Sequence, residues 1–115
     1  MLDKYKTLVA KLLNATSQKI LPWNKTSREN EYEAAVGDNS VSIKRHYKVG
    51  NIPDDKEYIS LFVWNRFGDI VDELRAYSYS EDFNNLASLF EAAEFAAIRA
   101  EDTLDEILAD ISRIG

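Results

Sequence analysis

The chain has 115 residues, with 14 Lys and Arg against 20 Asp and Glu, so its formal net charge is −6. This length fits a single domain, and a hydrophobic content of 45% is typical of a globular protein. The absence of Cys excludes disulfides, thiolate zinc sites, iron–sulfur clusters and cysteine nucleophiles. Because no apolar run approaches the ~20 residues that span a bilayer, we expect a cytoplasmic protein that does not bind a membrane.

The chain opens with an amphipathic pattern. Apolar residues recur at helical spacing among three lysines, which predicts a helix over residues 2–16. Pro22 disfavours a helical conformation of the residue before it, so residues 20–23 are expected to form an extended connector. The polar stretch of residues 24–30 is predicted to be a loop.

Four segments then alternate between apolar and polar residues, as strands do. They cover residues 32–36, 41–49, 57–64 and 70–77. Asn65-Arg66-Phe67-Gly68 matches a type I turn before the last of them. Connections this short favour antiparallel neighbours, so we predict a four-stranded meander. A bulge at Gly68 would shift the last pair by one residue, which leaves its register open.

An apolar stripe without Pro or Gly runs from Ser80, a predicted helix cap, to Ile114. It fits one helix of more than thirty residues, or two helices with a break at Asp102-Thr103. An unbroken helix would be about 50 Å long, whereas a strand of this sheet spans about 25 Å. The helix would therefore extend beyond the sheet, and the first helix or a second copy would have to cover it. The expected fold is a two-layer α+β domain over residues 1–115.

The third predicted strand is apolar on both faces. Ile59, Leu61 and Val63 lie on one face, and Tyr58, Phe62 and Trp64 lie on the other. In one interpretation the helices cover these aromatic residues, which are then ordinary core. In the other, the aromatic face stays open as a homodimer surface or a ligand groove.

The negative charge is concentrated near the end of the chain. Residues 81–115 hold nine acids and two bases, a net charge of −7, and residues 1–80 hold eleven acids and twelve bases, a net charge of +1. Like charges one helical turn apart repel each other, and a basic surface opposite them would offset this repulsion. That surface is either the face of Lys4, Lys6 and Lys11 or a separate basic protein.

Few residues indicate catalysis, a metal or a cofactor. His46 is expected at the surface of a strand, with no local partners for a catalytic triad. The acid pairs of the last helix lack Glu-x-x-His and EF-hand spacing, which favours a solvated helix face. Four isolated glycines form no phosphate-binding motif, and the acidic composition argues against nucleic acid as a partner. We therefore expect no cofactor and no metal.

Several features together resemble a group of small uncharacterised proteins of bacteria and phages. These features are the amphipathic first helix, Leu21-Pro22-Trp23, the turn segment from Asn65 to Val71, and the helical run from Leu86 to Ala93. The resemblance covers most of the chain and implies a bacterial setting near mobile elements or defence genes. It implies no particular activity.

These patterns favour a non-enzymatic protein-protein interaction domain, acidic and immunity- or inhibitor-like, that binds a protein partner or itself as a homodimer. Its contacts would be Glu94, Glu101, Asp105 and Asp110 on the last helix. One alternative is a small-ligand-binding domain that uses the face of Tyr58, Phe62 and Trp64. The other is a carboxylate- and metal-dependent enzyme.

Overall fold

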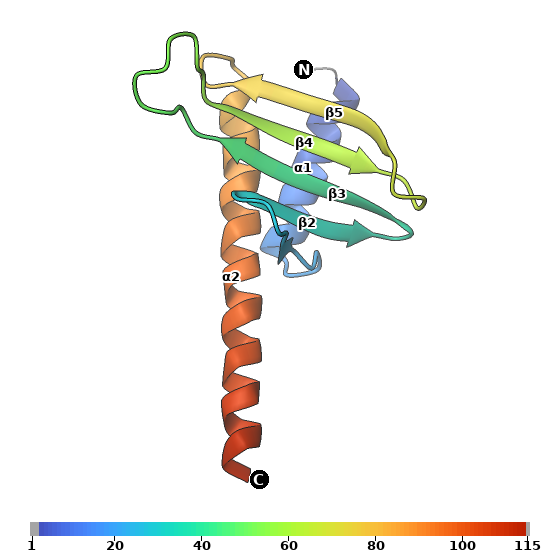
Figure 1. The fold of residues 1–115 in the computed structure, drawn as a ribbon. Coiled ribbons are helices and arrows are strands. Elements are labelled where there is room, and N and C mark those ends of the chain that lie inside the picture. Colours follow the sequence, from blue (N-terminus) through green and yellow to red (C-terminus); the bar gives the residue numbers. More distant parts are fainter. Residues whose placement is uncertain (1–2, 115) are drawn as a thin grey trace.

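The computed structural model describes residues 3–114. The elements are α1 (Asp3–Ser17), β1 (Asn24–Lys25), β2 (Glu31–Val36), β3 (Asn39–His46), β4 (Tyr58–Trp64), β5 (Ile70–Tyr77) and α2 (Phe83–Ile114). The strands form one antiparallel sheet in the order β1-β2-β3-β4-β5. Both helices lie on the same face of this sheet (Figure 1). The prediction of an α+β fold, in which one helix precedes an antiparallel sheet in the chain and another follows it, is confirmed.

The prediction of four strands was wrong, because the sheet has a fifth. Asn24 and Lys25 form β1, where a loop was expected, and pair with Glu33 and Tyr32 of β2. Both residues of β1 are polar and exposed, so their sequence carries no alternating pattern. The neighbouring Trp23 is 1% exposed, and its burial holds this short edge strand in place.

The second predicted strand also ends earlier than expected. β3 stops at His46, whereas the alternation extends to Val49, and both Tyr47 and Val49 are exposed. The Asp55 carboxylate explains this end: it accepts a hydrogen bond from the Val49 backbone N–H at 2.6 Å. It also lies 2.9 Å from Nε2 of His46. These bonds fold residues 47–57 into a loop instead of a longer hairpin.

The hydrophobic core lies between the sheet and the two helices. Tyr32, Ile43, Leu61 and Leu74 are neighbours across four strands and face the helices. From α2, one stripe packs against them, and its fully buried members are Leu86, Leu89, Phe90, Ala93 and Ala97. The two helices therefore cover one sheet face, and the other face carries no helix.

The connector after α1 is anchored by a buried polar pair. Trp23 Nε1 donates a hydrogen bond to Thr16 Oγ1 at 2.8 Å, and that hydroxyl donates to the Leu12 carbonyl at 2.7 Å. Thr16 is itself buried, so this pair satisfies the indole N–H away from water. Near the other end of α1, the Tyr5 hydroxyl donates a hydrogen bond to Asp72 of β5.

The last helix is continuous through Asp102-Thr103, which decides between the two possibilities that the sequence left open. Thr103 Oγ1 donates to the Arg99 carbonyl at 2.9 Å, so its hydroxyl is bonded within the helix and does not start a new one. With 32 residues, α2 extends well beyond the sheet (Figure 1). Neither α1 nor α2 has a stretch long and apolar enough to cross a bilayer.

Candidate functional site

The half of α2 that leaves the body of the protein is the most prominent surface feature. We call residues 98–114 the arm. Every residue of the arm is exposed, and its large apolar side chains are 49–59% exposed except for Ile114, at 87%. Helices of this length are normally stabilised by burying an apolar face. The arm has such a face, and within residues 3–114 nothing covers it.

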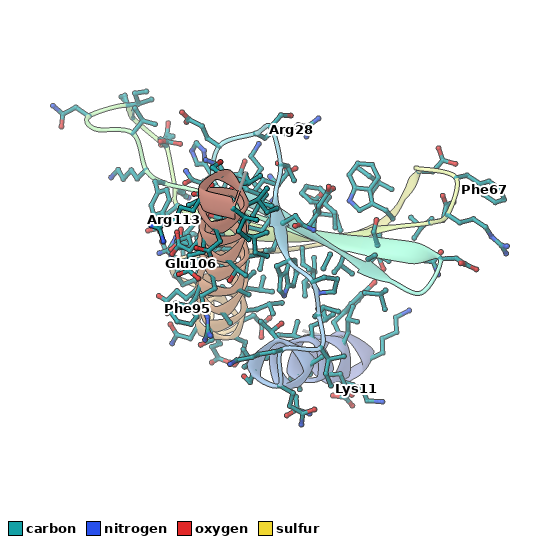
Figure 2. All side chains as sticks on the ribbon, turned by 90° about the horizontal axis from the view of Figure 1, so that it is seen from below. Lys11, Arg28, Phe67, Phe95, Glu106 and Arg113 are labelled. Atoms are coloured by element: carbon teal, nitrogen blue, oxygen red, sulfur yellow. The ribbon has the colours of Figure 1, made fainter. Side chains whose placement is uncertain are left out.

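The apolar face of the arm continues the stripe that packs against the sheet. Phe90, Ala93 and Ala97 recur at intervals of three and four residues, and the same spacing leads on through the arm. We call the following residues the seam: Ala100, Leu104, Ile107, Leu108, Ile111 and Ile114. Figure 2, a view along the arm from its end, shows Glu106 and Arg113 on the side of α2 that faces away from the sheet and α1. The seam therefore points to the side of α2 on which the body lies.

The four acids predicted as contacts occupy different positions on α2. Glu94 is half-buried at the body, where its Oε2 accepts a hydrogen bond from the Tyr32 hydroxyl at 3.3 Å. Burial and this carboxylate raise the pKa of Tyr32 above 10.0. Glu101 lies on the arm at one edge of the seam, and Asp105, one turn farther on, lies farther round the helix on the same side; we call these two residues the acidic flank. Asp110 lies at the opposite edge, 3.5 Å from Arg113.

The lysines of α1 do not neutralise the arm. Among residues 3–114, no ion pair joins Lys4, Lys6 or Lys11 to an acid of α2. Lys4 instead contributes, after the Tyr5 hydrogen bond, to lowering the pKa of Asp72. The arm holds five acids and two arginines, a net charge of −3, in contact with solvent.

The face of the sheet opposite the helices carries a row of aromatic rings. His46 stacks on Tyr58, with ring centres 4.9 Å apart, and Tyr77 meets Tyr58 edge to face at 5.6 Å. Tyr79 stacks on Tyr77 at 5.6 Å, and the Arg75 guanidinium lies 4.3 Å from the Tyr58 ring centre. These rings are therefore ordered by one another and by a cation, on a face that no helix covers.

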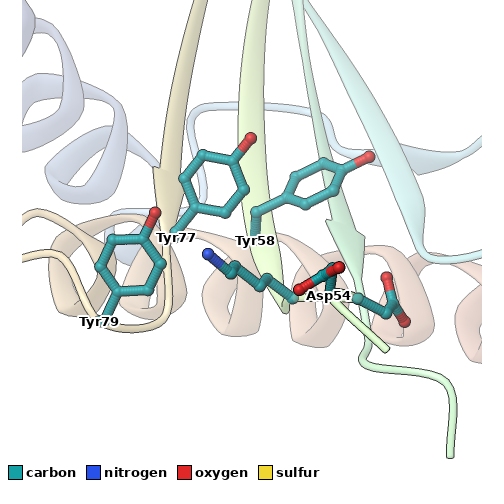
Figure 3. A pocket seen from close by; sticks show the side chains of 6 residues that line it. Asp54, Tyr58, Tyr77 and Tyr79 are labelled. Atoms are coloured by element: carbon teal, nitrogen blue, oxygen red, sulfur yellow. The ribbon is translucent and has the colours of Figure 1, made fainter. Parts of the chain in front are cut away.

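A hollow of about 540 Å³ lies beside this row. Tyr58, Tyr77 and Tyr79 line one side of it, and Asp54, Asp55 and Lys56 line the other (Figure 3). The Val49 and His46 contacts hold the pKa of Asp55 below its ordinary value. The sequence indicated Tyr58 for such a groove, but the hollow also depends on the 47–57 loop, which follows no alternating pattern.

Phe62 and Trp64, the other two aromatic residues predicted for this face, lie farther along β4 and do not line the hollow. Trp64 Nε1 donates a hydrogen bond to Ser42 Oγ at 2.9 Å, which fixes its ring across β3. Phe62 is opposite Ser42 and Glu73 in the sheet. All three predicted aromatic residues thus share the open face, but only Tyr58 joins the hollow.

A second, larger groove of about 760 Å³ lies at the base of the arm. The end of α1 and the Leu21-Pro22-Trp23 connector form one wall. The other wall is α2, through Phe95 and the small residues Ala96 and Ala100. The sequence did not indicate this groove, because it combines residues 16–24 with a distant part of α2, and half of its α2 residues are alanines. Lys19 and Arg99 line it as cations.

Within the part of the chain that the structure describes, no three His, Cys, Asp or Glu side chains come together as they would around a metal ion. Comparisons of the chain with protein-family models, with curated proteins and with solved structures found no match.

Proposed function

We propose that this protein is a non-enzymatic interaction protein that binds other protein surfaces through the arm of α2. The observation that carries this proposal is the seam, a row of large apolar side chains at about half exposure on the exposed part of α2. Exposed apolar patches of this kind on soluble proteins usually mark interaction sites. Binding an apolar helix face is also a common mode of protein recognition.

The acidic flank supports a basic surface as the complement of the arm. Glu101 and Asp105 are one turn apart, and like charges at this spacing destabilise a helix by a few tenths of a kcal/mol. A cationic partner would relieve this repulsion and would also associate faster, because opposite charges steer the encounter. In this arrangement the protein acts as an acidic, inhibitor-like binder.

Site-specific photo-crosslinking in the native cells tests the proposal. A photoreactive residue replaces Glu101, the acid at the edge of the seam, and in a matched chain it replaces Glu106, an acid on the outer side of the arm. We expect a defined covalent adduct with another protein from position 101 and none from position 106. In the purified pair, Glu101→Lys should weaken binding, whereas the control Glu106→Lys should not. Equal effects of the two substitutions, or the absence of any adduct, would refute the proposal.

A second candidate function, the binding of a small ligand, is favoured by the hollow beside Tyr58, Tyr77 and Tyr79. Clefts that bind small molecules combine aromatic walls with a few polar groups, and here Asp54 and Lys56 supply the polar groups. Sugars and flat ring compounds fit these walls. Titration of a mixed oligosaccharide and heterocycle library, followed by the NMR signals of the tyrosine rings, tests this candidate. Shifts confined to these three rings would support it, and a library without effect on them would count against it.

A further inference from the structure

We propose that the groove at the base of the arm binds the anion of a fatty acid, with its carboxylate between Lys19 and Arg99 and its alkyl chain along the apolar walls. This site is separate from the seam, so the inference goes beyond the proposed function and does not rest on it. Three observations support this class of ligand: the charge of the groove, the apolar surface inside it, and the backbone conformation of Lys19.

The charge of the groove is opposite to that of the helix that forms one of its walls. Residues 81–115 hold nine acids and two bases, yet among the described residues no acid lines the groove, and Lys19 and Arg99 line it as cations. Within residues 3–114 neither cation forms an ion pair with a carboxylate. Two such cations at one groove favour an anionic group, and a carboxylate accepts hydrogen bonds from a guanidinium and an ammonium together.

The walls of the groove offer apolar surface for the rest of the ligand. Leu21 and Pro22 line one wall, and Phe95, Ala96 and Ala100 line the other. Phe95 is 63% exposed, so much of its ring is in contact with water in the free protein. An alkyl chain between these walls would release that water. The walls are mainly aliphatic, which fits a flexible chain better than a stacked ring, and a volume of about 760 Å³ is typical of sites for small molecules.

The backbone of Lys19 points to a role of its side chain other than stability. The N–H groups of Lys19 and Ile20 close the end of α1 by donating to the carbonyls of Thr16 and Ala15, at 3.0 and 2.9 Å. This cap holds Lys19 at a φ of +61°, in the left-handed region, where Gly is the usual residue. A side chain is strained in this conformation. Strained backbone of this kind concentrates at binding and catalytic sites, and here it places a cation at the groove.

A series of alkyl carboxylates, each kept below its micelle concentration, tests the site in the full-length protein. NMR follows the two indole N–H signals: Trp23 lines the groove, and Trp64, which is bonded to Ser42 on the open face of the sheet, is the internal reference. We expect dodecanoate to shift the Trp23 signal and not the Trp64 signal. Each CH₂ group added between octanoate and dodecanoate should tighten binding about two- to fourfold. Dodecyltrimethylammonium, with the same chain and a positive charge, should bind about tenfold more weakly than dodecanoate.

Matched variants test the two cations. Lys19→Gly removes the charge and relieves the strained backbone, so it should weaken dodecanoate binding about three- to fivefold without lowering the urea midpoint. Arg99→Gln should weaken binding to a similar extent. Asn30→Gly, at a φ of +54° and outside the groove, is the control for the backbone change, and Lys11→Gln is the control for the loss of a lysine. Neither control should change the affinity.

A Trp23 signal that dodecanoate leaves unchanged would overturn the inference. Equal binding of the alkylammonium, or unchanged affinity in both Lys19→Gly and Arg99→Gln, would also overturn it, because the groove would then not select an anion. Binding to phosphatidylglycerol vesicles without binding to free dodecanoate would assign the two cations to a membrane surface instead. Each of these results would leave the proposed function standing if the arm still forms its adduct with another protein from position 101.

Discussion

Replacing Ile107 with Ala is expected to weaken binding of the arm to its protein partner about fivefold. The substitution removes three carbons, each of which contributes about 0.8 kcal/mol when it is fully buried. Ile107 is 50% exposed in the free protein, so its burial against the partner contributes roughly half of that energy, about 1 kcal/mol. Because 1.4 kcal/mol changes Kd tenfold, a loss of about 1 kcal/mol raises Kd about fivefold.

Isothermal titration calorimetry with the purified partner that photo-crosslinking identifies measures this change in Kd. Ile98→Ala is the matched control, because Ile98 has nearly the same exposure, 49%, but lies outside the seam. Ala favours helix more than Ile does, so a weaker Kd would not come from melting of the arm. An unchanged Kd for Ile107→Ala, or an equal loss for Ile98→Ala, would refute the argument that the seam forms the interface.

Three further predictions concern the body of the protein. Thr16→Val leaves the buried Trp23 N–H without an acceptor, so urea unfolding followed by tryptophan fluorescence should show a loss of about 1–3 kcal/mol, and a change under about 0.5 kcal/mol would contradict this. The hydrogen bond from Tyr5 lowers the pKa of Asp72 below 3.8, so the stability that this bond contributes is present above pH 3.8 and is lost as the pH falls through the pKa of the folded state. The difference between the urea midpoints of wild type and Tyr5→Phe should therefore become smaller in acid. A difference that becomes larger in acid would contradict this prediction. Tyr79→Ala removes a side chain that is 71% exposed, so the Tm should stay within about 2–4 °C of wild type, and a larger drop would assign the ring a structural role.

The sequence predicted both helices and four strands of the sheet, because their apolar residues follow the periods of helix and strand. It missed β1, whose two polar residues have no pattern and pair only because Trp23 is buried beside them. It extended β3 to Val49, because alternation does not reveal that Asp55 binds the Val49 N–H. These errors share one cause: each depends on a contact between residues that no local rule relates.

The candidate sites divide in the same way. The continuous stripe from Phe90 to Ile111 is visible in the sequence as a repeated spacing, so the overhang of the last helix was predictable. The side of the body that the seam faces was not predictable, since it depends on where the sheet packs against α2. Of the residues that line the two hollows, the sequence indicated only Tyr58, because each hollow combines side chains from segments that meet only in the folded chain.

The continuity of α2 has a consequence for how the arm becomes ordered. Starting a helix is its slowest and least favourable step, whereas extending an existing helix adds one hydrogen bond per residue. The first half of α2 is fixed by the core, so the arm grows from a turn that is already formed. Its order therefore depends on the folding of the body, and a chain whose core is loosened would lose its binding surface before its sheet unfolds. Lengthening the arm by one heptad would extend its apolar face by about 10 Å without altering the core.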